Sequence, residues 1–196
     1  NTEFGFKVNP NNLMLKEFVT NIDNKYIPQS TKIFTLSNEV SKRLKNYNNI
    51  SSEVMYSPLK DSDHYFCDGF DDYLLYPSRI SPIKRQHLVI EAMKLTKTNV
   101  KIYIIGKCNE DSYDKKISKM IKDYDLSKKV IITGEISQSE KFKLYSKSLG
   151  AVFIPFKEDY GLVTLEASSS KKPTISTYDS GGIMELIKND ENGIIT

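Results

Sequence analysis

The sequence predicts an α/β protein with a Rossmann-like, doubly wound parallel sheet over most of its 196 residues. Two observations support this fold class. From residue 72 onward, short apolar runs with β-forming residues alternate with amphipathic segments of helical length. The short runs are apolar throughout, which is typical of parallel strands that are buried on both faces. We therefore expect strands and helices to alternate, with helices covering both sides of one sheet.

Six strands and five helices are predicted between residue 72 and the last residue. The strands are expected at 72–76, 100–106, 129–134, 151–156, 173–177 and 193–196. The helices are expected at 84–96, 111–124, 137–148, 161–170 and 181–189. Ser137 followed by Glu140 fits a capping box, which predicts that the third of these helices begins there.

The first 60 residues carry a separate pattern. Two helices are expected at 11–27 and 38–47, and two strands at 32–37 and 52–58. The stretch "LKDSDHYFCDGFDD" follows; it is rich in Asp and has no hydrophobic period, as is typical of a linker or hinge. We therefore predict two domains, one at 1–60 and one at 61–196.

The composition argues against several classes of function. The net charge of +3 is small, and lysines such as Lys115, Lys116 and Lys119 are spread along a helix, which does not favour nucleic-acid binding. Cys67 and Cys108 are not in a CxxC arrangement, and with two histidines the sequence shows no metal-ligand cluster. No apolar run approaches the ~20 residues that span a bilayer, and no signal pattern is present. We expect a cytoplasmic protein without a metal or cofactor.

The loop "PSRISPIKR" follows the first strand of the predicted sheet. In open α/β sheets ligands bind at the carboxyl ends of strands, so this loop is a candidate site. It places Arg79 and Lys84 five residues apart, just before a helix begins. Two cations beside a helix N-terminus suit a diphosphate, because the helix dipole and its free amides add to their charge. A solvated turn with two surface bases is the alternative, and this loop alone favours that alternative.

The segment "FKEDYGLVTLEASSS" carries two glutamates at the end of another strand. Glu158 precedes a helix that is expected to start near Gly161, and Glu166 lies beyond the first turn of that helix. Its spacing from Leu162 and Val163 puts Glu166 beside an apolar stripe. A buried carboxylate without a partner is costly, so Glu166 is expected to hold a hydroxyl, a cation or backbone amides. A helix with a partly exposed glutamate is the alternative.

Glycines end several of the predicted strands or follow them. Gly106 closes the strand "IYIIG", and Gly181 and Gly182 stand at the start of the short helix expected at 181–189. Glycine lets the backbone turn tightly and lets a ligand approach closely. Gly181 and Gly182 are expected to form a second amide-rich edge that faces the same place as Glu158. Ordinary turn chemistry is the alternative for each of these glycines.

Taken in order, these segments resemble one family. "SRISPIKRQHLVIEAM", "VIITGEISQSEKFKLYSKS", "AVFIPFKEDYGLVTLEASSSKKPTIST" and "SGGIMELIKNDENGIIT" are similar to the C-terminal, group 1 domain of retaining glycosyltransferases with the GT-B fold (family 4). The resemblance runs continuously over 72–196 and extends weakly upstream through "IFTLSNEVSKRL" and "SEVMYSPL". The two-glutamate motif with its spacing is the most specific element.

The resemblance implies a role for each candidate residue. Arg79 and Lys84 would bind the diphosphate of a nucleotide-sugar donor and stabilise its charge as it leaves. Glu158 would contact the donor sugar and complete the catalytic set with those two cations. Glu166 would accept hydrogen bonds from the ribose hydroxyls. The other donor-binding residues that the resemblance implies are Gly161, Leu162, Val163, Gly106, Glu135, Ile136, Gly181 and Gly182.

The implied activity is transfer of a hexose, without a metal ion, from a UDP- or GDP-linked donor to a glycan, lipid-linked or other acceptor. The domain at 61–196 would bind the nucleotide sugar and stop before its last helix, and 1–60 would be the end of the acceptor domain. We expect the chain by itself to transfer little or no sugar, and peripheral membrane contact of the whole protein is left open. A nucleotide-sugar epimerase, a phosphorylase and a non-catalytic binding domain with the same fold are alternatives.

Two positions depart from the family pattern. Ser78 and Arg85 stand where the family usually has glycine, one before Arg79 and one after Lys84. Neither change removes a charged ligand of the implied site. They therefore bear more on which donor is bound than on whether one is bound.

Overall fold

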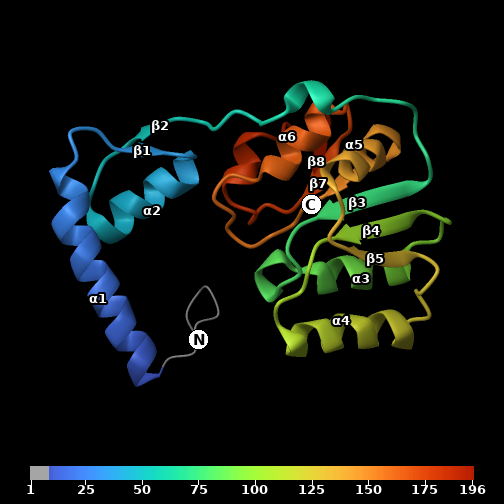
Figure 1. Cartoon of the computed structure of the whole chain (residues 1–196), viewed down its shortest axis with the longest axis horizontal. Coiled ribbons are helices and arrows are strands. Elements are labelled where there is room, and N and C mark those ends of the chain that lie inside the picture. The colour runs from blue at the N-terminus through green and yellow to red at the C-terminus, as the bar shows by residue number, and fades with distance from the viewer. Residues whose placement is uncertain (1–8) are drawn as a thin grey trace. The chain divides into compact units, whose positions relative to one another are not determined.

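A six-stranded parallel sheet forms the centre of Pro58–Thr196, the larger of two compact units in the computed structural model of the chain (Figure 1). The structure describes residues 9–196. The strands are β3 (Tyr73–Pro77), β4 (Lys101–Ile105), β5 (Val130–Gly134), β6 (Gly150–Val152), β7 (Thr174–Ser176) and β8 (Gly193–Ile195). Their order across the sheet, β5-β4-β3-β6-β7-β8, is that of doubly wound nucleotide-binding folds. The predicted fold class is confirmed.

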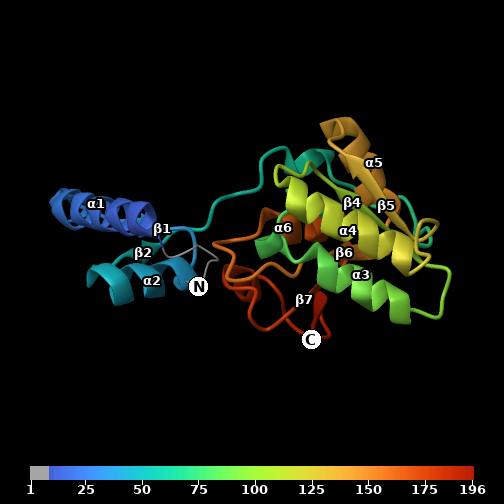
Figure 2. The ribbon, with the colours of Figure 1, turned by 90° about the horizontal axis from the view of Figure 1, so that it is seen from below.

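Helices cover both faces of this sheet, as Figures 1 and 2 show. One face carries α3 (Gln86–Leu95) and α4 (Asp111–Asp123), and the other carries α5 (Gln138–Lys147) and α6 (Leu162–Ser169). At the start of α5 the Ser137 amide donates to the Glu140 carboxylate (2.9 Å), and the Glu140 amide donates to Ser137 Oγ (3.2 Å). The predicted capping box is therefore present and satisfies amides that the first turn leaves free.

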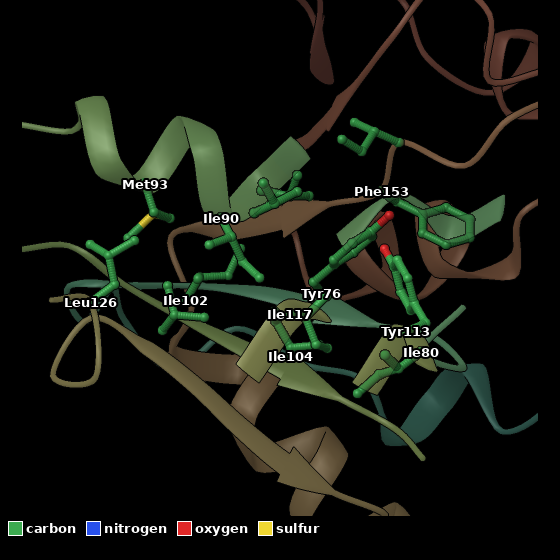
Figure 3. Close-up of a cluster of buried hydrophobic side chains, with 14 of the residues drawn as sticks. Tyr76, Ile80, Ile90, Met93, Ile102, Ile104, Tyr113, Ile117, Leu126 and Phe153 are labelled. Atoms are coloured by element: carbon green, nitrogen blue, oxygen red, sulfur yellow. The ribbon is translucent and has the colours of Figure 1, made fainter. Parts of the chain in front are cut away.

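The core is split between the two faces by the alternation of side chains along each strand. Tyr76, Ile102 and Ile104 belong to the cluster that packs under α3 and α4, which is shown in Figure 3. Leu75 and Ile105, their neighbours in sequence, belong to a second cluster under α5 and α6. Both faces of the strands are thus buried, which explains why the strands are apolar throughout rather than alternating.

The strand predicted at 151–156 is shorter in the structure. Only Gly150–Val152 is a strand, and one more bond to β7 follows it, from the Phe153 amide to the Ile175 carbonyl (2.9 Å). Pro155 lacks the amide hydrogen that a longer ladder would need. The early end of β6 releases the following residues into the loop that carries Glu158.

The prediction of a helix at 181–189 is wrong. The structure has one 3₁₀ turn there, η4 (Gly182–Glu185). The Asn192 side chain accepts from the Lys188 amide (2.7 Å) and donates to the Leu186 carbonyl (3.0 Å). An asparagine side chain that bonds to the backbone in this way competes with helix formation.

The smaller unit, Asn1–Ser57, is described by itself. It contains α1 (Pro10–Tyr26), η1 (Ile27–Gln29), β1 (Phe34–Thr35), α2 (Asn38–Asn48) and β2 (Glu53–Val54). The two strands pair in parallel around α2 and are shorter than the predicted 32–37 and 52–58. The boundary between the units lies near the expected one at 60/61, and the identity of 1–60 as the end of an acceptor domain stays a prediction.

The stretch expected to be a linker packs onto the larger unit. After a 3₁₀ turn, η2 (Ser62–His64), Tyr65 is buried and its ring makes edge contacts with Phe142 (4.7 Å) and Tyr145 (5.6 Å). Further along, the Lys172 ammonium donates to the Gly69 carbonyl and lies 3.7 Å from the centre of the Phe70 ring. These contacts fasten the stretch to α5 and to the start of β7.

The described part of the chain, residues 9–196, contains no helix that is both long and apolar enough to cross a bilayer.

Candidate functional site

The candidate site lies where the strand order of the sheet reverses. β3 pairs with β4 on one side and with β6 on the other, so the chain runs outward from the middle in both directions. The helices that follow β3 and β6 lie on opposite faces (Figures 1 and 2). In doubly wound folds, ligands bind at the carboxyl ends of two strands that diverge in this way.

Lys84 and Glu158 face each other across this point. The Lys84 ammonium donates to Glu158 Oε2, and the two side chains are 12% and 24% exposed. The ammonium also lies 5.5 Å from the centre of the Phe153 ring, which packs edge-on against Tyr76 (Figure 3). The Tyr76 hydroxyl donates to the Lys84 carbonyl, and burial raises the pKa of this hydroxyl. The structure therefore brings together a cation and a carboxylate from two loops.

Gln86 holds the loop that carries Arg79. It is fully buried, and its amide nitrogen donates to Ser78 Oγ and to the Arg79 carbonyl, both at 2.9 Å. Its amide oxygen accepts from the Ser81 amide (3.3 Å) and from the Tyr113 hydroxyl (3.4 Å). Within the described residues the exposed Arg79 guanidinium has no hydrogen-bond or ion-pair partner. Buried Gln86 thus holds the backbone of the loop after β3, while the Arg79 side chain of that loop is exposed to solvent.

Gly181 and Gly182 fix the main chain of Glu158. The Glu158 amide donates to the Ser180 carbonyl (3.0 Å), and the Gly182 amide donates to the Glu158 carbonyl (2.8 Å). Gly181 has a φ of +76°, and a Cβ at that position would collide with the Glu158 backbone. The Gly182 amide was expected to form an edge that faces the ligand. In the structure it is bonded to the neighbouring loop instead.

A second ion pair joins the loops after β3 and β7. The Arg85 guanidinium donates to both carboxylate oxygens of Asp179, at 2.8 and 2.6 Å, and lies 4.8 Å from the centre of the Phe156 ring. The hydrogen bonds from Arg85 lower the pKa of Asp179. Sequence reasoning missed this pair, because nothing in the spacing of the two residues indicates that their loops meet.

Glu166 lies in α6 and is 9% exposed. Its Oε1 accepts from the Lys141 ammonium (2.6 Å), and its Oε2 accepts from the Tyr145 hydroxyl (2.9 Å). Burial, and then the negative charge of Glu166, raise the pKa of Tyr145 and of Tyr65. Glu166 was expected to hold a hydroxyl, a cation or backbone amides. In the structure the Lys141 ammonium and the Tyr145 hydroxyl of the protein itself bind it. Sequence reasoning missed Lys141 and Tyr145, although their i, i+4 spacing places both on one face of α5.

The first residues of α6 lie beside Glu158. Gly161 is the N-cap with a φ of +79°, and a Cβ there would collide with the Ile183 side chain. Leu162 is exposed and Val163 is half-buried. The first amides of a helix have no partner within it, so this end of α6 can donate hydrogen bonds to an anion.

The other candidate residues belong to the loops after β4 and β5. A Cβ on Gly106 would collide with the Ser78 carbonyl, so this glycine lets the loop after β3 pack closely. The Gly106 amide donates to the Gly134 carbonyl (2.9 Å). Glu135 is exposed, and Ile136 packs against the cluster under α5 and α6. Gly106 therefore has a packing role in the structure, and the part of these residues in ligand binding stays a prediction.

Among residues 9–196 no group of three or more His, Cys, Asp and Glu side chains is placed to hold a metal ion. Cys67 and Cys108 are both unpaired thiols in this part of the chain.

Comparison with protein families matches residues 64–196 to the family described as glycosyl transferases group 1. The chain is 27% identical to an O-antigen chain mannosyltransferase of Salmonella typhimurium, over 73% of this chain and 41% of that protein. It is 34% identical to a poly(ribitol-phosphate) α-N-acetylglucosaminyltransferase of Staphylococcus aureus, over 60% of this chain and 24% of that protein. The chain thus spans less than half the length of these relatives.

Solved structures share the fold. HepE of Anabaena, in complex with UDP and glucose, superposes with a TM-score of 0.78 at 20% identity, over 92% of this chain and 52% of that chain. The C-terminal domain of a group 1 glycosyl transferase (LpcC) from Francisella tularensis superposes with a TM-score of 0.62 at 26% identity, over 70% of this chain and 80% of that chain. The larger unit therefore has the fold of glycosyltransferase domains.

Proposed function

Because the chain belongs to the group 1 family of glycosyl transferases, we propose that Pro58–Thr196 is the donor-binding half of an enzyme that transfers a hexose from a UDP- or GDP-linked sugar. The observation that carries this proposal is the position of Lys84 and Glu158. They face each other at the point where the strand order reverses, with the exposed Arg79 on the same loop as Lys84.

Arg79 and Lys84 are assigned to the diphosphate. Glycosyl transfer develops positive charge on the sugar and negative charge on the departing group. Cations that are fixed before the reaction stabilise that negative charge, and a single such donor contributes about 3 kcal/mol in comparable sites. Gln86 holds the loop that carries both cations, because it binds the loop backbone at Arg79 and Ser81. The first amides of α6, at Leu162 and Val163, add the positive end of a helix dipole.

Glu158 is assigned to the donor sugar. Its carboxylate lies beside the Lys84 ammonium, so one side chain can touch the sugar while the other touches the phosphate next to it. The loop pairing at Gly181 holds the Glu158 backbone in place. We propose that the sugar is transferred with retention at its anomeric carbon, which the NMR spectrum of the product tests directly.

Glu166 is assigned to the ribose. A carboxylate offers about four acceptor positions, and Lys141 and Tyr145 occupy one on each oxygen. The Tyr65 hydroxyl also hydrogen-bonds to Glu166, and the acceptor capacity that remains suits a ribose hydroxyl. Gly106, Glu135 and Ile136 are kept as candidates beside the base.

We propose that donor binding needs neither a metal ion nor a cofactor, since two fixed cations already face the diphosphate. The acceptor, a glycan or a lipid-linked sugar, would be bound mainly by residues outside Pro58–Thr196. A cytoplasmic location, with peripheral contact to a membrane where the acceptor is lipid-linked, is part of the same proposal. One relative named above is an O-antigen chain mannosyltransferase and the other a poly(ribitol-phosphate) α-N-acetylglucosaminyltransferase, which supports a polymeric acceptor.

Calorimetric titration of the 196-residue chain with UDP and with GDP, in buffer that contains EDTA, tests the proposal. One of the two nucleotides is expected to bind, and EDTA is expected to make no difference. The matched variants are Arg79→Ala, which should weaken binding at least tenfold, and Lys115→Ala, which removes an exposed lysine of α4 and should not. A folded sample that binds neither nucleotide would contradict the assignment of the site.

A further inference from the structure

The contacts of Glu166 point to a role for α5 that rests on the proposed function. We propose that Lys141 and Tyr145 are positioning residues that hold the Glu166 carboxylate where it discriminates a ribose from a 2′-deoxyribose. Neither residue is assigned a contact with the donor. Their effect on ligand choice passes through Glu166.

Each oxygen of this carboxylate has one anchor. Lys141 Nζ lies 2.6 Å from Oε1, and the Tyr145 hydroxyl lies 2.9 Å from Oε2. The last torsion of a glutamate side chain is soft, so an unanchored carboxylate rotates freely. Two anchors on different oxygens fix that rotation. The anchors stand one turn apart on α5, and the Tyr65 hydroxyl also hydrogen-bonds to the carboxylate, so its direction is set by the protein.

Burial makes this arrangement rigid. The Lys141 and Glu166 side chains are 18% and 11% exposed, and Tyr145 is fully buried. Tyr65 packs edge-on against the Tyr145 ring at 5.6 Å, and the Lys141 ammonium lies 5.9 Å from the centre of the Tyr65 ring. A buried ion pair that loses one partner leaves an uncompensated charge, which then reorients toward water. Loss of the Lys141 ammonium should therefore turn the carboxylate away from its present direction.

Loss of the Lys141 ammonium is expected to change the binding of the ribose and not that of the diphosphate. The cations assigned to the diphosphate lie on the loop after β3, which Gln86 and Tyr76 hold through bonds to the Arg79 and Lys84 carbonyls. A reoriented Glu166 should thus cost the hydrogen bonds to ribose hydroxyls and leave the phosphate contacts unchanged. The ratio of the affinities for a ribonucleotide and its 2′-deoxy analogue reports this difference.

The test uses the 196-residue chain and calorimetric titration with UDP and 2′-deoxy-UDP, or with the guanine pair if GDP is the nucleotide that binds. The wild type is expected to prefer the ribonucleotide about tenfold, as a hydrogen bond to a charged group predicts. Lys141→Met keeps the aliphatic stem and should bring the ratio close to one, with 2′-deoxy-UDP binding changed less than about threefold. Lys141→Arg restores the cation and should restore the ratio. Lys143→Met, on the exposed side of α5, should leave the ratio as in the wild type.

Tyr145→Phe removes one hydroxyl and gives the same readout if Lys141→Met does not fold. An unchanged ratio in a folded Lys141→Met or Tyr145→Phe variant overturns the inference. An equal loss of affinity for both nucleotides overturns it as well, because that result indicates a general disturbance of the fold. If the wild type binds both nucleotides equally, Glu166 does not recognise the ribose and the inference is overturned. The assignment of the diphosphate site is not affected by that result. A wild type that binds neither contradicts the proposed function itself.

Discussion

The Lys84–Glu158 ion pair determines what each of these residues can do toward a donor. The side chains are 12% and 24% exposed, so most of each is removed from water and loss of either charge leaves the other uncompensated. The consequence of the pair lies in the charge: Glu158 offsets the Lys84 ammonium and keeps it beside the position proposed for the sugar.

Glu158→Gln should separate binding from catalysis. The change removes a negative charge next to the proposed diphosphate, so UDP affinity is expected to stay within about threefold of the wild type or to rise. Transfer by the complete protein is expected to fall about 100-fold, because a charge aimed at the reacting sugar is lost. A thermal melt of the variant checks that it is still folded. Transfer at the wild-type rate would rule out a catalytic role for Glu158.

The Arg85–Asp179 pair gives a prediction about pH. Because hydrogen bonds from Arg85 lower the pKa of Asp179 in the folded state, the pair adds stability above the ordinary carboxyl pKa of 3.8. That contribution is lost as the pH falls through the lowered folded-state value. Urea unfolding from pH 7 to pH 3 should show the wild type more stable than Asp179→Asn at pH 7. The difference should shrink below about pH 3.8; a difference that grows there would contradict the assignment.

At the scale of elements, one buried side chain supports the loop between β3 and α3. Gln86 makes four hydrogen bonds, three of them to residues of that loop. The loop carries Arg79, so the position of a binding cation depends on a residue that need not touch the ligand.

Gln86→Leu should lower the free energy of unfolding by about 1–3 kcal/mol, since its partners lose their bonds in a buried place. It should also weaken UDP binding severalfold, because the backbone of Arg79 is released. Ile117→Val is the matched control: it costs about 0.5–1.5 kcal/mol in the core under α4 and should leave binding unchanged. Equal effects of the two variants on UDP binding would show that Gln86 acts through stability alone.

Elements whose signal is local could be predicted from the sequence. The apolar strands and the capped helix α5 depend on neighbouring residues, and the structure has them near the expected positions. The helix at 181–189 could not be excluded, because the side chain that replaces it, Asn192, lies beyond its end. The ion pairs of Arg85 with Asp179 and of Lys141 with Glu166 join distant parts of the chain, and only the completed fold brings them together.

At the scale of the whole molecule, all proposed donor contacts lie within Pro58–Thr196. This unit also includes the stretch "LKDSDHYFCDGFDD", which was expected to be a linker or hinge. Tyr65 packs on Phe142 and Tyr145 of α5. Lys172 contacts Gly69 and Phe70. The boundary that matters for folding is therefore the start of this stretch rather than the start of β3.

Two truncated chains test whether the folding unit begins at the packed stretch or at β3. A chain of residues 58–196 should fold and bind UDP within about threefold of the 196-residue chain, because every residue assigned to the donor and its supports is retained. A chain of residues 73–196 should be less stable, since the loss of Tyr65 exposes Phe142 and Tyr145, and a buried aromatic ring contributes about 3–5 kcal/mol. Thermal melts and UDP titrations of both chains measure the difference. Equal melting temperatures would mean that the packed stretch adds nothing to the domain, and that Tyr145 holds Glu166 without its help.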